Sequence, residues 1–89
     1  MSSKLNVVLT GASGNVGIDV FKELLSRNSQ INLRIFSRKS KKNRKLFKSY
    51  KDDIEIVWGD LLDYDAVKRA VEGQDVVIHL AAIIPPDSY

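Results

Sequence analysis

Three evenly spaced glycines follow directly after a short apolar run near the start of the chain. Segment 7–17 reads VVLTGASGNVG, and its glycines are Gly11, Gly14 and Gly17. This spacing predicts a strand that enters a tight turn and then a helix whose free N–H groups and dipole attract an anion. We expect Gly11 to allow the turn, Gly14 to let the backbone approach a phosphate, and Gly17 to bring the helix close to the sheet. A purely structural glycine turn is the alternative, because short glycine motifs also occur without a ligand.

The composition allows one small domain that needs neither a disulfide nor a metal. The chain has 89 residues, of which 44% are apolar, and it contains no cysteine and a single histidine. No His, Asp and Glu residues cluster at a spacing typical of metal ligands. No apolar run approaches the roughly 18 residues that a membrane span requires. We therefore predict a cytoplasmic domain that holds no metal and contacts no membrane.

Apolar segments with two different periods alternate along the chain. We expect strands at Leu5–Thr10, Ile31–Ser37, Ile54–Trp58 and Asp75–Ala82, and helices at Asn15–Arg27, Arg44–Tyr50 and Tyr64–Glu72. Gly73 is predicted to end the last helix, and residues 38–43 to form a loop. Alternating strands and helices predict an α/β fold with a parallel sheet flanked by helices. The expected strand order is 3-2-1-4, which is half of a doubly wound sheet.

Three motifs at the predicted strand ends resemble those of the extended short-chain dehydrogenases/reductases, the NAD(P)-dependent epimerase/dehydratase family. They are TGASGNVG at 10–17, GDLLD at 59–63 and VIHLAA at 77–82. The resemblance covers almost the whole chain but only the N-terminal part of a typical member. It implies a Rossmann-type NAD(P)-binding domain of an enzyme that transfers hydride at a hydroxyl-bearing carbon. We expect a fragment that is not catalytic by itself, with a stand-alone nucleotide-binding unit as the alternative.

The resemblance also implies a role for residues in each motif. The glycine segment would bind the pyrophosphate through Gly11, Ser13, Gly14, Asn15, Val16 and Gly17. Asp60 would accept a hydrogen bond from the adenine amino group, and Leu61 would pack beside the ring. Ala81 and Ala82 would line the ribose, where small side chains leave room.

The end of the second predicted strand favours NADP over NAD. An acid at this position would bind the adenosine 2′-hydroxyl, whereas an arginine accommodates a 2′-phosphate. The chain has Ser37, Arg38 and Lys39 there, and no acid nearby. The Arg38 guanidinium can grip a phosphate with two parallel hydrogen bonds, the Ser37 hydroxyl can assist, and Lys39 adds charge. We predict NADP as the cofactor, with NAD as the alternative.

Two further features resemble catalytic groups but favour structural roles. Tyr64 and Lys68 have the Tyr-x-x-x-Lys spacing of the family's catalytic pair, but the family carries that pair on a much later helix. We interpret this spacing as a coincidence and predict no catalytic residue in this chain. His79 lies inside an apolar strand, where a lone histidine favours a structural hydrogen bond over catalysis.

The positive charge of the chain is concentrated in one segment. Residues 38–51 hold eight of the fourteen basic residues, and no acid lies between Glu23 and Asp52. We interpret the segment as a solvated face near the cofactor's phosphate end, and we do not expect nucleic acid as a partner. The alternatives are a basic nucleic-acid or interaction module and a non-catalytic NADP sensor of the NmrA type.

We also expect self-association through the exposed fourth strand, because apolar strand edges invite pairing.

Overall fold

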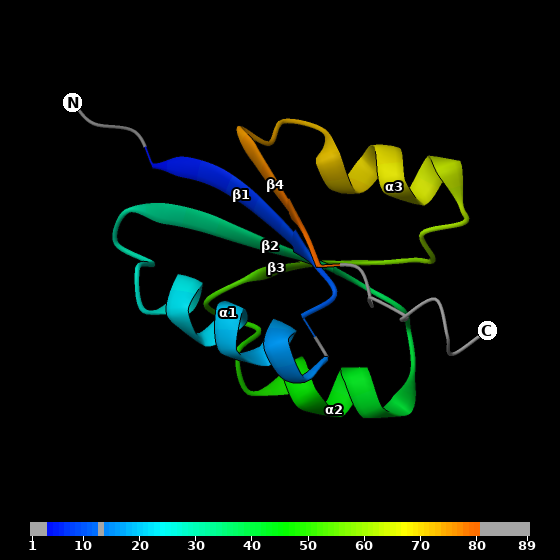
Figure 1. Ribbon diagram of the computed structural model, residues 1–89, viewed down its shortest axis with the longest axis horizontal. Coiled ribbons are helices and arrows are strands. Elements are labelled where there is room, and N and C mark those ends of the chain that lie inside the picture. Colours follow the sequence, from blue (N-terminus) through cyan, green and yellow to red (C-terminus); the bar gives the residue numbers. More distant parts are fainter. Residues whose placement is uncertain (1–3, 13, 81–89) are drawn as a thin grey trace, which may run out of the picture.

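A parallel sheet with helices on both faces forms the protein (Figure 1). The computed structural model describes residues 4–12 and 14–80. Within these residues the elements are β1 (Leu5–Thr10), α1 (Asn15–Leu25), β2 (Ile31–Ser37), α2 (Lys41–Lys48), β3 (Glu55–Trp58), α3 (Tyr64–Val71) and β4 (Val76–His79). Helices α1 and α2 cover one face of the sheet and α3 covers the other (Figure 1).

The strand order is β3-β2-β1-β4, with every neighbouring pair parallel. This confirms the predicted α/β class and the order 3-2-1-4. Strand β1 lies in the middle, where Val8 pairs with Arg34 of β2 on one side and Val77 of β4 on the other. The carboxyl ends of all four strands therefore meet along one edge of the sheet.

The core consists of two apolar clusters, one on each face of the sheet. Alternate residues of β1 point to opposite faces, as the period of a strand requires. Val7 and Leu9 belong to the cluster under α1 and α2, and Val8 belongs to the cluster under α3. Phe21 of α1 and Phe47 of α2 are fully buried in the first cluster, with ring centroids 5.4 Å apart in an edge-to-face arrangement. This contact fixes α2 beside α1.

Helix α2 begins earlier than predicted, at Lys41 instead of Arg44. The Ser40 hydroxyl accepts a hydrogen bond from the Asn43 backbone N–H at 3.1 Å and so caps the helix. The Asn43 side-chain amide donates to the Arg38 carbonyl at 2.9 Å, which holds the preceding turn against the helix. The prediction of a loop over 38–43 is therefore wrong for its second half, because a cap and not an apolar pattern sets this helix start.

Smaller differences occur at the ends of other elements. Helices α1, α2 and α3 each end one or two residues before their predicted ends, and Gly73 follows α3 with a φ of +76°, as its predicted role requires. Strands β3 and β4 each begin one residue later than predicted. The structure describes β4 to His79 and the chain to Leu80. Ala81 and Ala82, which were predicted to extend this strand, lie outside the described residues.

The described residues offer neither a membrane span nor a metal site. Over residues 4–12 and 14–80, no helix is long and apolar enough to cross a membrane. The same residues contain no group of three His, Cys, Asp or Glu side chains that could hold a metal ion. The cytoplasmic location stays a prediction.

Candidate functional site

Two of the three glycines are required by backbone packing. Gly11 has a φ of +79°, and a Cβ atom there would lie 2.0 Å from the Leu80 carbonyl oxygen. A Cβ atom on Gly17 would lie 1.9 Å from the Gly11 carbonyl oxygen. Both distances are far below van der Waals contact, so only glycine allows the turn and the close approach of α1.

Gly14 differs from the other two, because the protein itself does not require a glycine there. Its φ of −78° and ψ of 171° are open to any residue. The nearest atom to a Cβ on Gly14 would be the Gly11 carbonyl oxygen at 3.7 Å, an ordinary contact. The space beside Gly14 is therefore open, as a backbone that receives a phosphate group needs.

The same glycine begins α1. Gly14 is the N-cap, and in the described part of the chain no side chain caps this helix. The first N–H groups of a helix lack internal partners and carry the positive end of the helix dipole. This turn can consequently accept an anion from outside the chain.

A cavity of about 240 Å³ lies next to the glycine turn. Its walls come from the carboxyl ends of β1, β2 and β3 and from α2. The lining residues are Thr10, Gly11, Phe36, Ser37, Arg38, Asn43, Gly59, Asp60 and Leu61. Ligands of parallel sheets bind at this edge. The structure thus brings together five residues that the sequence predicts to bind the cofactor: Gly11, Ser37, Arg38, Asp60 and Leu61.

Arg38 and Asp60 face each other across this cavity. The Arg38 Nε atom lies 3.9 Å from the Asp60 Oδ2 atom, and the two side chains are 80% and 50% exposed. Such an exposed ion pair contributes little energy. The other Asp60 oxygen, Oδ1, accepts a hydrogen bond from the Leu62 N–H at 2.9 Å, which fixes the carboxylate. Arg38 is therefore available to a competing anion, whereas Asp60 is held in place.

The remaining predicted site residues do not line the cavity. Gly14, Val16 and Gly17 belong to the adjacent glycine turn and the start of α1, and Lys39 is exposed outside the cavity. Asn15 is the first residue of α1. Ser13, Ala81 and Ala82 lie outside the described residues.

Sequence reasoning missed several lining residues, of which Asn43 is the most informative. Asn43 is only 9% exposed, and its amide holds the Arg38 backbone. The signal for it was a serine three residues earlier, since a Ser-x-x-Asn segment can cap a helix that buries its asparagine. Gly59 begins the GDLLD motif, but the sequence alone predicted no role for it. A Cβ atom there would lie 2.5 Å from the Ala66 Cβ and 3.0 Å from the Phe36 ring, so close helix packing requires this glycine.

Within the described part of the chain, the residues that resemble catalytic groups do not line this cavity. His79 shares a hydrogen bond between its Nδ1 atom and the Thr10 hydroxyl, which fits its predicted structural role. Tyr64 is the first residue of α3 and is 78% exposed. The absence of a catalytic role for Tyr64 and Lys68 stays a prediction.

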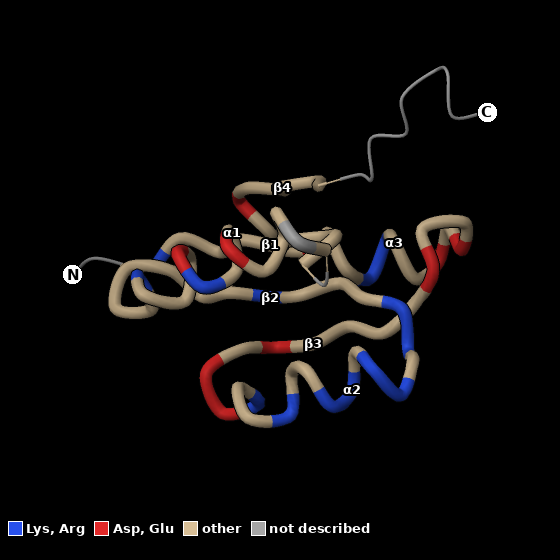
Figure 2. The backbone as a smooth tube through the Cα atoms, turned by 60° about the horizontal axis from the view of Figure 1, so that its bottom comes forward, with Lys and Arg blue, Asp and Glu red and all other residues tan. Residues whose placement is uncertain are grey.

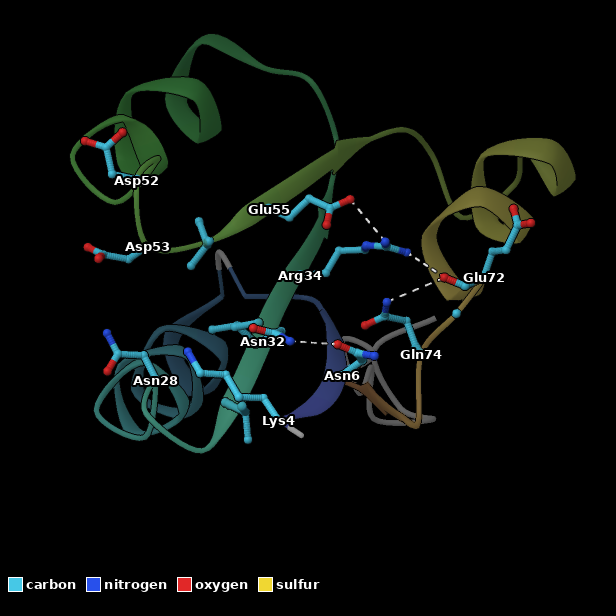
Figure 3. A pocket seen from close by; sticks show the side chains of 14 residues that line it. Lys4, Asn6, Asn28, Asn32, Arg34, Asp52, Asp53, Glu55, Glu72 and Gln74 are labelled. Carbon is cyan, nitrogen blue, oxygen red and sulfur yellow. Dashed lines mark hydrogen bonds and ion pairs between the residues drawn. The ribbon is translucent and has the colours of Figure 1, made fainter. Parts of the chain in front are cut away.

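A larger hollow of about 550 Å³ lies at the opposite edge of the sheet, near the amino ends of the strands. Figure 3 shows that polar and charged side chains surround it and that Arg34 reaches from β2 to the end of α3. Arg34 Nη1 donates to the carbonyls of Arg69, Ala70 and Glu72 at 3.2, 3.0 and 2.9 Å. Its Nη2 atom lies 3.1 Å from a Glu55 carboxylate oxygen. Arg34 thereby joins β2, β3 and α3.

Comparison with known proteins identifies the family to which this chain belongs. The family model described as NAD(P)H-binding matches residues 11–87, and the chain belongs to this family. Sanguinarine reductase of Eschscholzia californica is 37% identical over 84 residues, which are 94% of this chain and 29% of that protein. The chain thus spans less than a third of the length of this relative.

Solved structures agree with this assignment. The structure of Pen from Bacillus thuringiensis matches with a TM-score of 0.76 and 31% identity over 96% of this chain and 26% of that one. A short-chain dehydrogenase/reductase superfamily protein of Agrobacterium tumefaciens, solved with bound NAD, matches with a TM-score of 0.63 and 27% identity over 91% of this chain and 21% of that one. The predicted resemblance to this superfamily is confirmed, and the chain is an NAD(P)-binding domain of the reductase and dehydrogenase type.

Proposed function

We propose that this chain is the cofactor-binding part of an NADP-preferring reductase. The observation that carries the preference is Arg38, an exposed guanidinium at the mouth of the cavity, whose ion-pair partner Asp60 is 3.9 Å away. A reductase is favoured over an NmrA-type sensor because a relative with 37% identity is named a reductase. In the larger protein, the bound nicotinamide would exchange a hydride with a hydroxyl-bearing carbon of the substrate.

The adenosine and phosphate groups of the cofactor have proposed partners in this chain. The open backbone at Gly14 and the uncapped start of α1 support binding of the pyrophosphate, with the residues 11–17 that surround it. Arg38 would bind the 2′-phosphate, assisted by Ser37 and Lys39. Asp60 and Leu61 would contact the adenine, in line with their place on the cavity wall. The proposed roles of Ser13, Ala81 and Ala82 still rest on the sequence motifs.

Calorimetric titration with NADPH and NADH at fixed salt tests this proposal. The wild-type chain is expected to bind NADPH more tightly than NADH. Arg38→Ala should lower the NADPH affinity by about ten- to a hundredfold, because a charge-assisted hydrogen bond contributes about 1.5–3 kcal/mol. Its NADH affinity should change by less than about twofold, since NADH lacks the phosphate that Arg38 would bind. Tyr64→Phe is the control and should bind both cofactors as the wild type does.

Two outcomes of this titration would contradict the proposal. A folded chain that releases no heat with either cofactor would mean that the glycine turn is only structural or that further strands of the larger protein complete the site. Tighter binding of NADH would instead overturn the role of Arg38 and leave the dinucleotide site in place.

We also propose that the chain self-associates through β4. In the described part of the chain β4 pairs only with β1, and Val76 and Val77 are 36% and 50% exposed. Sedimentation velocity should show a dimer whose fraction increases with protein concentration. Val77→Lys should return the protein to a monomer, because a lysine on an edge strand opposes pairing. A wild-type monomer at all concentrations would refute this proposal.

A further inference from the structure

Helix α2 presents a line of cations to solvent. Lys41, Arg44, Lys45 and Lys48 are exposed and follow the i, i+3, i+4, i+7 spacing that places side chains on one helix face. We call these four residues the basic stripe, and Figure 2 shows the positive charge along α2. Across residues 4–12 and 14–80, no stripe side chain takes part in an ion pair or a hydrogen bond.

The stability of α2 does not explain the whole basic stripe. Like charges three and four residues apart on a helix repel each other. Lys41 also lies in the first turn, where the helix dipole disfavours a cation and where α2 has no acid, whereas Lys45 and Lys48 lie in the last turn, where the dipole favours one. The helix is held instead by the Ser40 cap and by buried Phe47 on its opposite side. Residues placed against the local preference of their helix indicate a function.

The basic stripe begins beside the cofactor cavity. Asn43, in the first turn of α2, lines that cavity and holds the Arg38 backbone. A helix rises about 1.5 Å per residue, so the stripe extends only about 10 Å from Lys41 to Lys48. This length is close to the Debye length of about 10 Å at 0.1 M salt. All four charges of the stripe can therefore contribute to the electrostatic potential around this end of α2 at low salt.

We propose that the basic stripe is an electrostatic guide that gives NADPH a faster association rate than NADH. The inference rests on the proposed function, because it requires that NADPH bind in this cavity. Clustered charge raises the association rates of oppositely charged ligands, and the effect falls steeply with salt. The additional phosphate of NADPH carries about −1.5 to −2 charges near neutral pH. Since the stripe residues do not line the cavity, they act before contact and leave the dissociation rate unchanged.

Stopped-flow mixing with the fluorescence of Trp58 can measure both rates. Trp58 is the only tryptophan and directly precedes Gly59 of the cavity wall. At about 0.02 M salt, Lys41→Gln with Lys45→Gln should slow NADPH association by about three- to tenfold and NADH association by less than about twofold. The difference should vanish near 0.5 M salt, where charges are screened within about 4 Å. The matched control, Lys68→Gln with Arg69→Gln, removes two exposed cations from α3 and should change neither rate.

Three results would contradict the proposal that the basic stripe speeds NADPH association. NADPH association that is unchanged in the stripe variant, or slowed no more than that of NADH, would exclude selective guidance. A faster dissociation with an unchanged association rate would show direct contact instead. Duplex DNA that binds the wild type but not the stripe variant, with unaltered NADPH rates, would assign the stripe to nucleic acid. A wild type that binds no NADPH would refute the proposed function itself, so that the two failures are distinguishable.

Discussion

Gly17→Ala is expected to destabilise the protein strongly at 25 °C. The added Cβ atom would lie 1.9 Å from the Gly11 carbonyl oxygen, 2.8 Å from the Gly11 carbonyl carbon and 2.9 Å from the Ala12 Cα. All three atoms are backbone, so α1 must move away from the end of β1. Displacing a packed helix costs about 3 kcal/mol or more, from a total stability of only about 5–15 kcal/mol in ordinary domains. Urea denaturation followed by circular dichroism measures the loss.

Gly14→Ala is the matched control and separates the ligand from the fold. Its Cβ atom meets nothing closer than 3.7 Å. Replacing an N-cap glycine by alanine should cost less than about 1 kcal/mol. The methyl group would, however, occupy the open side of the turn, so that NADPH affinity should fall by about tenfold or more, equivalent to at least about 1.4 kcal/mol. Unchanged affinity in a folded Gly14→Ala variant would contradict the proposed phosphate site.

Arg34→Met is expected to destabilise the protein by detaching the end of α3 from the sheet. The Arg34 side chain is only 16% exposed, and its loss leaves three carbonyls at the end of α3 without this donor. Hydrogen bonds from a charged group contribute about 1.5–3 kcal/mol, and methionine preserves much of the side-chain bulk. We expect a loss of about 2 kcal/mol, which lowers the melting temperature of a domain this small by roughly 8–16 °C. The ion pair with Glu55 adds little, because that carboxylate is 63% exposed.

Scanning calorimetry of Arg34→Met and Arg27→Met checks this expectation. Arg27 pairs with Glu23 on the surface of α1, with side chains 57% and 65% exposed, and its replacement should cost about 0.5 kcal/mol or less. NADPH affinity should stay the same in both variants, since Arg34 lies at the opposite edge of the sheet from the cavity. Equal melting temperatures for the two variants would show that Arg34 does not hold α3.

The sheet could be predicted from the sequence because each strand carries its own signal. Apolar runs such as 5–10 are typical of parallel strands that are covered on both faces. The glycine turn then fixed which edge of the sheet would carry the site. Helix α2 gave a weaker signal, because residues 38–45 contain no apolar side chain from which a helical period could be measured. Its start depends on the Ser40 cap and on burial of Phe47, which only the folded chain provides.

The contact between Arg38 and Asp60 required knowledge of strand register. Ser37 pairs with Trp58, so the residues that follow β2 and β3 leave the sheet side by side. The sequence predicted that both would lie at the same edge, but not that they would form an ion pair. Asn43 was missed for a related reason, since a residue assigned to a loop was not expected to be buried beside Arg38.

The turn between β2 and α2 is held together largely by its own residues. The Ser40 hydroxyl holds the Asn43 backbone, and the Asn43 side chain holds the Arg38 carbonyl. A self-supporting segment can exchange its outward side chains without disturbing the sheet beneath it. If Arg38 and Lys39 bind the 2′-phosphate as proposed, substitutions at these two positions could change cofactor choice while Ser40 and Asn43 keep the turn in place. A protein engineer could use the same segment as an interchangeable module.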